Sequence, residues 1–358
     1  MKSTLYISAI LLLGNAIVHA QFNAAEFPPG NELPPVNSPQ VVEWMKAINP
    51  SQIPNFPLLK GSPPTCTGNT YAPDQCWSAC QPCYKDDVRV CPKAGDWAIT
   101  YDDGPSPDTP RLLQELKKRN IKATFFVMGT NVVKNAEILK QEVAEGHNIA
   151  SHTWSHRPLT TLTTEQIVAE IKWTEKAVFD ITGIKMKYIR PPYGDIDNRV
   201  RGIIKQLGYV VVGWTSDTYD SKDFSQTPAT MAAAVTTFST TLKTYAAAPG
   251  NEGIITLEHD HNPNVVSYGL SLLPAIDNIN LKIMSVDQCL GDKQPYQNSP
   301  ANNGTNGGNG GNGGTGGKGN DTTKPEIIRS AAGPSMGRSK ILEIAVGVLA
   351  FGAALASF

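Results

Sequence analysis

The sequence carries no excess of charge of either sign. Its 31 lysines and arginines balance 32 aspartates and glutamates, so the formal net charge is -1 over 358 residues. This balance gives no electrostatic reason to expect nucleic acid or a strongly anionic polymer as partner, and a neutral partner suits the chain better. The hydrophobic content of 40% is ample for a buried core. We therefore expect a globular protein of one large domain or two ordinary ones, and a monomer.

The N-terminus has the layout of a secretory signal peptide. Lys2 precedes a largely apolar stretch from Leu5 to Val18, and Val-His-Ala follows at 18–20. Cleavage is expected after Ala20, which makes residues 1–20 the signal peptide, with an uncleaved membrane anchor as the alternative. The protein is therefore expected to be secreted.

The C-terminal end is also apolar. Residues 341–358 are apolar apart from Glu343 and Ser357, and a polar spacer and three small residues precede them. This order predicts that residues 331–358 are replaced by a GPI anchor attached at Ser330. A retained transmembrane helix is the alternative. We therefore expect the protein at the cell surface, on the plasma membrane or in the cell wall.

Cysteine is scarce and unevenly distributed. Of six cysteines, five crowd into residues 66–91 and Cys289 stands alone far downstream. In an exported protein they are expected to form disulfides, and a Cys80-x-x-Cys83 zinc site is the weaker alternative. Because the first group holds an odd number of cysteines, one of them must pair with Cys289 over a long range, and Cys91 is the favoured partner. The other pairings stay open.

Composition divides the rest of the chain into segments. A Pro- and Asn-rich arm is expected to lie extended on the domain, followed by a cysteine-rich segment and a region of regular periodicity. A tract rich in Gly and Asn then forms a flexible tether, which holds N-glycosylation sequons at Asn303 and Asn320. The expected boundaries are 21–65 for the arm, 66–95 for the cysteine-rich segment, 96–290 for the main domain and 291–330 for the linker.

Within residues 96–290, strand-like apolar runs alternate with helix-like periods. The strand candidates are 97–101, 123–127, 148–150, 187–189, 210–214, 254–257 and 282–286. The helix candidates are 109–118, 135–145, 164–182, 198–207, 229–245 and 268–278. This alternation predicts a parallel α/β architecture, either an open sheet or a closed barrel. In both, catalytic residues gather at the carboxyl ends of the strands.

The first strand candidate ends in "TYDDGPS". Asp102 and Asp103 are adjacent there, although each raises the cost of ionising the other. A turn enforced by Gly104 and Pro105 can direct both carboxylates toward one mouth. Taken alone, the pair is ordinary turn composition.

The third strand candidate runs into "SHTWSH". His152 and His156 lie four residues apart, a spacing that brings two imidazoles to one side of a helical turn or tight loop. Two histidines and one carboxylate form a metal set that leaves positions open for water and substrate.

The fourth strand candidate ends in "RPPYG". Its two prolines stiffen the loop, so that Arg190 and the peptide N–H of Tyr193 are held in fixed positions. A rigid loop with a surface arginine is the alternative interpretation.

The last two strand candidates of interest also end in polar residues. "WTSDTYD" offers Asp217 and Asp220, with helix capping as the alternative role, and "TLEHDH" offers His259 and His261. Five strand ends that all carry catalytic residue types are hard to explain as separate accidents.

These five motifs, in this order and spacing, resemble the polysaccharide deacetylase family, carbohydrate esterase family four. The resemblance spans about residues 97–290, and the exported, anchored, cysteine-bearing form is similar to fungal chitin deacetylases. One departure is Ser221, which stands where the family often has tryptophan.

The resemblance implies a distorted (β/α) barrel with fewer than eight repeats. It also implies one divalent metal ion, Zn²⁺ or Co²⁺, held by Asp103, His152 and His156. Asp102 would be the general base and Arg190 would orient it. Metal beside one aspartate lowers the repulsion between the pair, so the other can stay ionised.

The resemblance implies roles for five further residues. The Tyr193 N–H would stabilise the oxyanion, and His259 would be the general acid, steadied by Asp220. Trp214 and Leu257 would shape an apolar pocket for the acetyl methyl group.

The implied reaction is hydrolysis of the N-acetyl groups of chitin or N-acetylglucosamine oligomers. Acetylated xylan is the alternative substrate, while the eukaryotic GPI signal argues against peptidoglycan. A non-catalytic wall protein that binds polysaccharide is the alternative from another class. The cysteine-rich segment could also be a separate chitin-binding module, in which Trp77 and Tyr84 stack on sugars.

Overall fold

The computed structural model describes residues 22–299 except 82, 85–86, 222–226 and 248–249. The described residues lie in one compact unit. The expected signal peptide, both sequons and the anchor signal at Ser330 lie outside them. Within the described part of the chain, no helix combines the length and apolar character needed to cross a membrane.

A parallel sheet forms the centre of this unit, as expected. Its strands run in the order β6-β5-β4-β3-β2-β8-β1-β9, and β7 pairs with β8. The register pairs are parallel throughout, for example Asp102 with His259 between β2 and β8. The bounds are β1 Asp96–Ala98, β2 Thr100–Asp102, β3 Thr124–Val127, β4 Asn148–Ser151, β5 Tyr188–Ile189, β6 Val210–Val211, β7 Ser216–Asp217, β8 Ile254–His259 and β9 Lys282–Met284.

The single first strand expected over 97–101 is divided at Ile99. Its N–H donates to the carbonyl of Met284 in β9, whereas its own carbonyl accepts from Thr124 in β3. The strand therefore exchanges neighbours in mid-course, with β9 beside β1 and β3 beside β2. This exchange bends the sheet toward a barrel.

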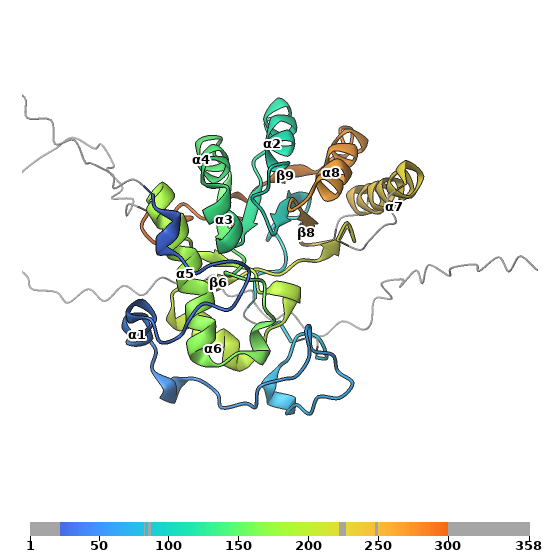
Figure 1. The fold of residues 1–358 in the computed structure, drawn as a ribbon. Helices are drawn as coiled ribbons and strands as arrows, with labels where there is room; N and C mark the ends of the chain where they lie inside the picture. The colour runs from blue at the N-terminus through green and yellow to red at the C-terminus, as the bar shows by residue number, and fades with distance from the viewer. Residues whose placement is uncertain (1–21, 82, 85–86, 222–226, 248–249, 300–358) are drawn as a thin grey trace, which may run out of the picture. The chain divides into compact units, whose positions relative to one another are not determined.

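Helices surround the strands. Neighbouring helices contact in the order α7, α8, α2, α4, α5, α6, and Figure 1 shows α4, α2, α8 and α7 fanned along one side. The bounds are α1 Pro39–Met45, α2 Thr109–Lys118, α3 Gly129–Lys134, α4 Ala136–Ala144, α5 Thr164–Thr182, α6 Asn198–Gln206, α7 Pro228–Ala247, α8 Pro263–Ala275 and α9 Val286–Cys289. Short 3-10 turns are η1 Ala24–Glu26, η2 Pro50–Gln52, η3 Pro73–Gln75, η4 Leu159–Thr161 and η5 Pro192–Gly194.

The strand residues divide between two cores. Phe125 and its alternate neighbours face the helices and join the main core, while Phe126 faces a smaller interior cluster. The period of two along a strand produces this division. The interior cluster includes Cys91 and Cys289, which form the expected long-range disulfide. The other two disulfides join Cys66 to Cys80 and Cys76 to Cys83.

The cysteine-rich segment continues the sheet. Val88 forms a parallel bridge with Val212, immediately after β6. Trp77 is fully buried, and its Nε1 donates to Asp195 Oδ1 at 2.8 Å. The alternative in which Trp77 stacks on sugars is therefore wrong, because no face of this ring is accessible.

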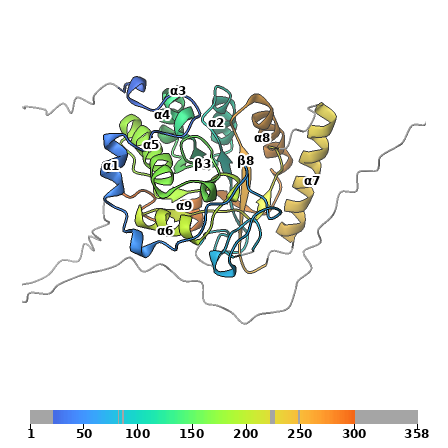
Figure 2. The same ribbon diagram turned by 60° about the horizontal axis from the view of Figure 1, so that its bottom comes forward.

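The arm is more than an extended strap. Phe27, Val41 and Ile48 are buried in the main core, and Trp44 packs against it. Figure 2 shows α1 alongside α5, and these two helices are in contact. The arm therefore contributes to the core of the unit that it covers.

Candidate functional site

The two adjacent aspartates share one end of the barrel. Asp102 ends β2, and Asp103 follows with a φ of 73°, in the left-handed region. Non-glycine residues enter this region at a cost of about 1–3 kcal/mol, so the surrounding structure must hold them there. Asn131 Nδ2 helps by donating to the Asp103 carbonyl at 2.7 Å. The reversal of side-chain direction expected from Gly104 and Pro105 thus begins at Asp103 itself.

Gly104 permits close packing beneath this turn. A Cβ atom at this position would lie 2.2 Å from Asp260 Oδ2. The Asp260 carboxylate in turn accepts from Thr109 Oγ1 at 2.5 Å. A side chain at residue 104 would therefore displace both aspartate-bearing loops.

Arg190 lies inside the barrel and holds Asp102. Its Nη1 donates to Asp102 Oδ1 at 2.7 Å and also to Thr100 Oγ1 at 2.7 Å. Its guanidinium lies 4.1 Å from the centre of the Phe126 ring, and the side chain is fully buried. The surface-arginine alternative is therefore wrong. Burial raises the pKa of Asp102 to about 6, although the charge of Arg190 opposes this shift.

His152 and His156 come together in the loop after β4. Their ring centres lie 5.0 Å apart, and His156 adopts a φ of 58°. His152 Nδ1 lies 2.8 Å from the Arg190 carbonyl, which leaves Nε2 directed at the aspartates. This contact assigns the proton of the neutral ring to Nδ1.

Glu170 of α5 shapes the loop between the two histidines. Its Oε2 accepts from the backbone N–H groups of Trp154 and Ser155, each at 2.8 Å. Glu170 is fully buried on the apolar side of its helix. Sequence analysis missed this residue, although a glutamate among the core positions of α5 was the available signal.

The two histidines and Asp103 could hold a metal ion. One ligand atom from each lies within 4.8 Å of the other two. The distances from Asp103 Oδ1 are 3.4 Å to His152 Nε2 and 3.2 Å to His156 Nε2. Asp103 Oδ1 is buried without a hydrogen-bond partner among the described residues. This unsatisfied carboxylate oxygen facing two imidazoles fits a divalent cation such as zinc.

Burial keeps both imidazoles neutral. It lowers the pKa of His152 to about 3, and it lowers the pKa of His156 as well. Neutral imidazole has the lone pair that metal coordination requires, so these histidines are ready to bind at neutral pH. His261 approaches from the other side, with Nδ1 3.5 Å from Asp103 Oδ2.

His259 has the opposite character. Its Nδ1 lies 2.7 Å from Asp220 Oδ1, and its backbone N–H donates to Asp220 Oδ2 at 2.8 Å. Burial alone lowers the pKa of His259, but the hydrogen bond and charge of Asp220 outweigh it and raise the pKa to about 10. Ser221 beside Asp220 has therefore not removed the carboxylate–imidazole contact. Asp217 instead accepts from the Tyr219 N–H at 2.7 Å.

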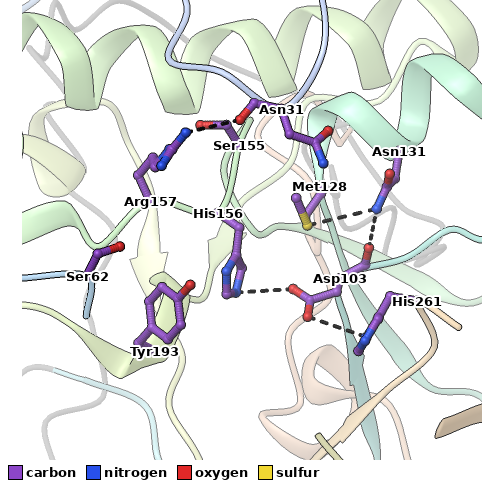
Figure 3. A pocket seen from close by; sticks show the side chains of 10 residues that line it. All are labelled: Asn31, Ser62, Asp103, Met128, Asn131, Ser155, His156, Arg157, Tyr193 and His261. Carbon is purple, nitrogen blue, oxygen red and sulfur yellow. Dashed lines mark hydrogen bonds and ion pairs between the residues drawn. The ribbon is translucent and has the colours of Figure 1, made fainter. Parts of the chain in front are cut away.

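A cavity of about 440 Å³ opens beside the cation ligands. Figure 3 shows Tyr193 and His156 side by side at its edge, with ring centres 4.5 Å apart. Tyr193 has a φ of 60° and a half-exposed side chain. The residues that line the cavity are Asn31, Ser62, Asp103, Met128, Asn131, Ser155, His156, Arg157, Tyr193 and His261.

Trp214 and Leu257 are not among the residues that line this cavity. The Trp214 ring is 5.6 Å from the Arg190 guanidinium, and a Cβ atom on Gly194 would meet that ring at 2.9 Å. Leu257 is buried in β8. The Trp214 ring therefore packs against the turn that presents Tyr193, whereas Leu257 lies beside Asp217 of β7.

The motifs thus converge as expected at the carboxyl ends of the strands. Asp103, His152 and His156 form one cluster, Asp102 and Arg190 form an ion pair beside it, and His259 with Asp220 forms a third group. Tyr193 faces the first cluster across His156. The arrangement brings a cation site, a carboxylate and a protonated imidazole to one rim.

Comparison with known proteins agrees with this geometry. A family model described as polysaccharide deacetylase matches residues 89–212. Chitin deacetylase 1 of Cryptococcus neoformans var. grubii is 41% identical over 281 residues, which cover 75% of this chain and 59% of that protein. A chitin deacetylase of Amylomyces rouxii is 33% identical over 298 residues, which cover 77% of this chain and 68% of that protein.

A solved structure of a chitin deacetylase has a similar fold. The chitin deacetylase from the fungal pathogen Colletotrichum lindemuthianum aligns with a TM-score of 0.55 and 32% identity, over 61% of this chain and 97% of that chain. The sequence and structural matches agree with the five motifs found in the chain. The chain belongs to the polysaccharide deacetylase family.

Proposed function

We propose that this chain is a chitin deacetylase, which hydrolyses the N-acetyl groups of N-acetylglucosamine units to give acetate and glucosamine units. The meeting of the cation ligands, the Arg190–Asp102 pair and the Asp220–His259 pair at one rim carries this proposal. The chitin deacetylases named above support chitin as the substrate. The nearly neutral charge of the chain suits an uncharged polymer.

The proposed cofactor is one divalent ion, Zn²⁺ or Co²⁺, held by Asp103, His152 and His156. Such an ion, when bound, polarises a carbonyl group and lowers the pKa of water. Asp103 supplies the negative charge, and the two neutral imidazoles supply nitrogen lone pairs.

Asp102 accepts the proton of the attacking water in the proposed mechanism. Its pKa of about 6 leaves it mostly ionised at neutral pH and still basic enough to receive a proton. Arg190 fixes the carboxylate through Oδ1 at 2.7 Å, so that Oδ2 remains for the water. Addition of water to the amide carbon then forms a tetrahedral intermediate.

The Tyr193 N–H donates to the oxygen of that intermediate, held by the rigid turn that follows Arg190. One such donor is typically worth about 10²- to 10³-fold in rate. His259 is protonated at neutral pH because of Asp220, and it donates its proton to the departing nitrogen. The C–N bond breaks, and acetate and a free amine leave. Trp214 and Leu257 are proposed to enclose the acetyl methyl group.

The test is mass spectrometry of N-acetylglucosamine oligomers after incubation with the zinc-loaded protein, compared with acetate release from acetylated xylan. Each deacetylated sugar is recognised by its lower mass, because a hydrogen atom replaces the acetyl group on the nitrogen. Asp102→Asn is expected to retain zinc but release almost no acetate. Binding of oligomers without any acetate release would favour a non-catalytic wall protein, and a preference for xylan would change the substrate.

We further propose secretion, with removal of residues 1–20, and attachment to the membrane through a GPI anchor at Ser330. The apolar segments at the two ends and the small residues at 330–332 support this proposal. Glycans at Asn303 and Asn320, and a monomeric state, belong to the same proposal. Mass spectrometry of the native protein released by phospholipase C tests the anchor.

A further inference from the structure

The arm approaches the catalytic rim through two anchored turns. The first is held by Phe27, which is buried and whose ring stacks on Trp154 with centres 6.2 Å apart and an interplanar angle of 11°. Phe27 also meets Trp173 edge-on at 5.9 Å. Trp154 belongs to the loop between His152 and His156. The arm therefore rests directly on the loop that carries the histidines.

The second turn is anchored by Leu59 and Asn69. Leu59 is buried, and its N–H donates to the Thr160 carbonyl at 3.1 Å. Asn69 Oδ1 accepts from the Lys60 N–H at 2.8 Å, while its Nδ2 donates to the carbonyls of Lys60 and Thr65, each at 2.9 Å. These bonds fix the turn that displays Ser62.

Both turns end at the cavity beside the cation ligands. Asn31 follows the first anchor and Ser62 follows the second, and both side chains are exposed in the cavity wall. Figure 3 shows Asn31 at the top of the opening and Ser62 at its left, with Arg157 between them. Arg157 Nη2 donates to the Asn31 carbonyl at 3.4 Å. Two segments distant from the catalytic motifs in sequence thus form part of the wall.

The chemistry of this wall suits a sugar. Asn31 offers an amide, Ser62 a hydroxyl and Tyr193 a half-exposed aromatic ring. Arg157 places a guanidinium in the same lining, and its Nη2 donates to the Asn31 carbonyl. Binding sites for neutral ligands combine a few polar groups with aromatic surface in this way.

We propose that Asn31 and Ser62 form a subsite for the sugar unit adjacent to the one that is deacetylated. This inference rests on the proposed function and deepens it, because it makes the N-terminal arm a determinant of the length of oligomer that the protein prefers. An oligomer that reaches both the cation site and the arm gains hydrogen bonds that a shorter one lacks.

The first measurement compares KM for N-acetylglucosamine oligomers of increasing length, using the zinc-loaded full chain. Asn31→Ala and Ser62→Ala are each expected to raise KM for the longer oligomers by about 2- to 10-fold, the range for one neutral hydrogen bond. The change is expected in KM more than in kcat, and to shrink for the shortest substrate. Asn37→Ala, exposed in the same arm but outside the cavity lining, is the matched control and should leave KM unchanged.

The second measurement separates this inference from the proposed activity. Calorimetric titration of the zinc-loaded Asp102→Asn protein with the tetramer of N-acetylglucosamine reports binding without turnover. A higher Kd when Asn31→Ala or Ser62→Ala is added supports the subsite. This result would hold even if the wild type released no acetate and the proposed activity failed. Equal Kd and equal KM for the wild type and the Asn31→Ala/Ser62→Ala double variant, both folded, would overturn the subsite.

Discussion

Replacing Asp220 by asparagine should lower the upper pH limit of activity. The carboxylate meets both His259 Nδ1, at 2.7 Å, and the backbone N–H, at 2.8 Å, in a site where only 8% of the histidine is exposed. The pKa of His259 is raised from 6.5 to about 10. That difference corresponds to about 5 kcal/mol of preferential stabilisation of the imidazolium. Without the charge of Asp220, burial opposes the charged ring, and the pKa of His259 should fall back toward 6.5.

The assay compares initial rates of acetate release at pH 7 and pH 8. With a pKa of 6.5, the protonated fraction of His259 falls from about 24% to about 3% between these values, whereas with a pKa near 10 it stays close to one. Asp220→Asn should therefore lose about eightfold in rate over this single pH unit, while the wild type changes little. Asp220→Glu, which keeps a carboxylate, is the matched control.

The contribution of His259 to folding stability should also decrease as the pH rises. Because the folded-state pKa of His259 is raised, its contribution is fully present below pH 6.5 and is lost as pH rises through about 10. Zinc content and the thermal midpoint must match the wild type before rates are compared. An Asp220→Asn protein that retains the wild-type ratio of rates at pH 7 and pH 8 would refute the role of the carboxylate.

Three other perturbations address the metal, its supporting loop and the long-range disulfide. EDTA should abolish acetate release and added Zn²⁺ or Co²⁺ restore it, whereas His152→Ala should lose both bound zinc and activity, measured by metal analysis; full activity in EDTA would contradict the metal requirement. Glu170→Gln should weaken zinc affinity by about 10- to 100-fold in a competition titration, while the exposed Glu165→Gln should not, and equal affinities would exclude a positioning role. Joint replacement of Cys91 and Cys289 by serine should lower the free energy of unfolding by up to about 5 kcal/mol for their separation of 198 residues, and an unchanged denaturant midpoint would contradict this.

The sequence predicted elements well where their signals are local. Residues 109–118 and 164–182 coincide with α2 and α5. α5 begins with a capping box between Thr163 and Gln166 and ends at Gly183 in the left-handed region, so both boundaries are encoded within a few residues.

Elements that depend on distant partners were not predictable in the same way. The break at Ile99 exists because its N–H and carbonyl bond to strands far away in the sequence. The expected strand over 210–214 is shortened to β6 at Val210–Val211, and β7 at Ser216–Asp217, paired with β8, was not expected. The short α3 also escaped detection, and α8 begins at Pro263 rather than near residue 268. Tertiary hydrogen bonding decides these boundaries.

The residues of the candidate site also divide into those with a local sequence signal and those that depend on distant contacts. Its catalytic candidates occur in compact motifs at strand ends, where residue type alone indicates chemistry. Glu170 and Asn131 act on backbone atoms of those loops, and Asn31 and Ser62 reach the cavity only because the arm is packed in the core. Their roles depend on three-dimensional proximity, which a single sequence does not contain.

The stacking of Phe27 on Trp154 joins the N-terminal arm to the loop that carries the two proposed metal-binding histidines. Thermodynamic linkage then makes the two processes reciprocal, since an ion that orders the loop also favours docking of the arm by the same free energy. By the same linkage, release of the arm would weaken retention of the ion. Docking of the arm would thereby report on the occupancy of the proposed metal site.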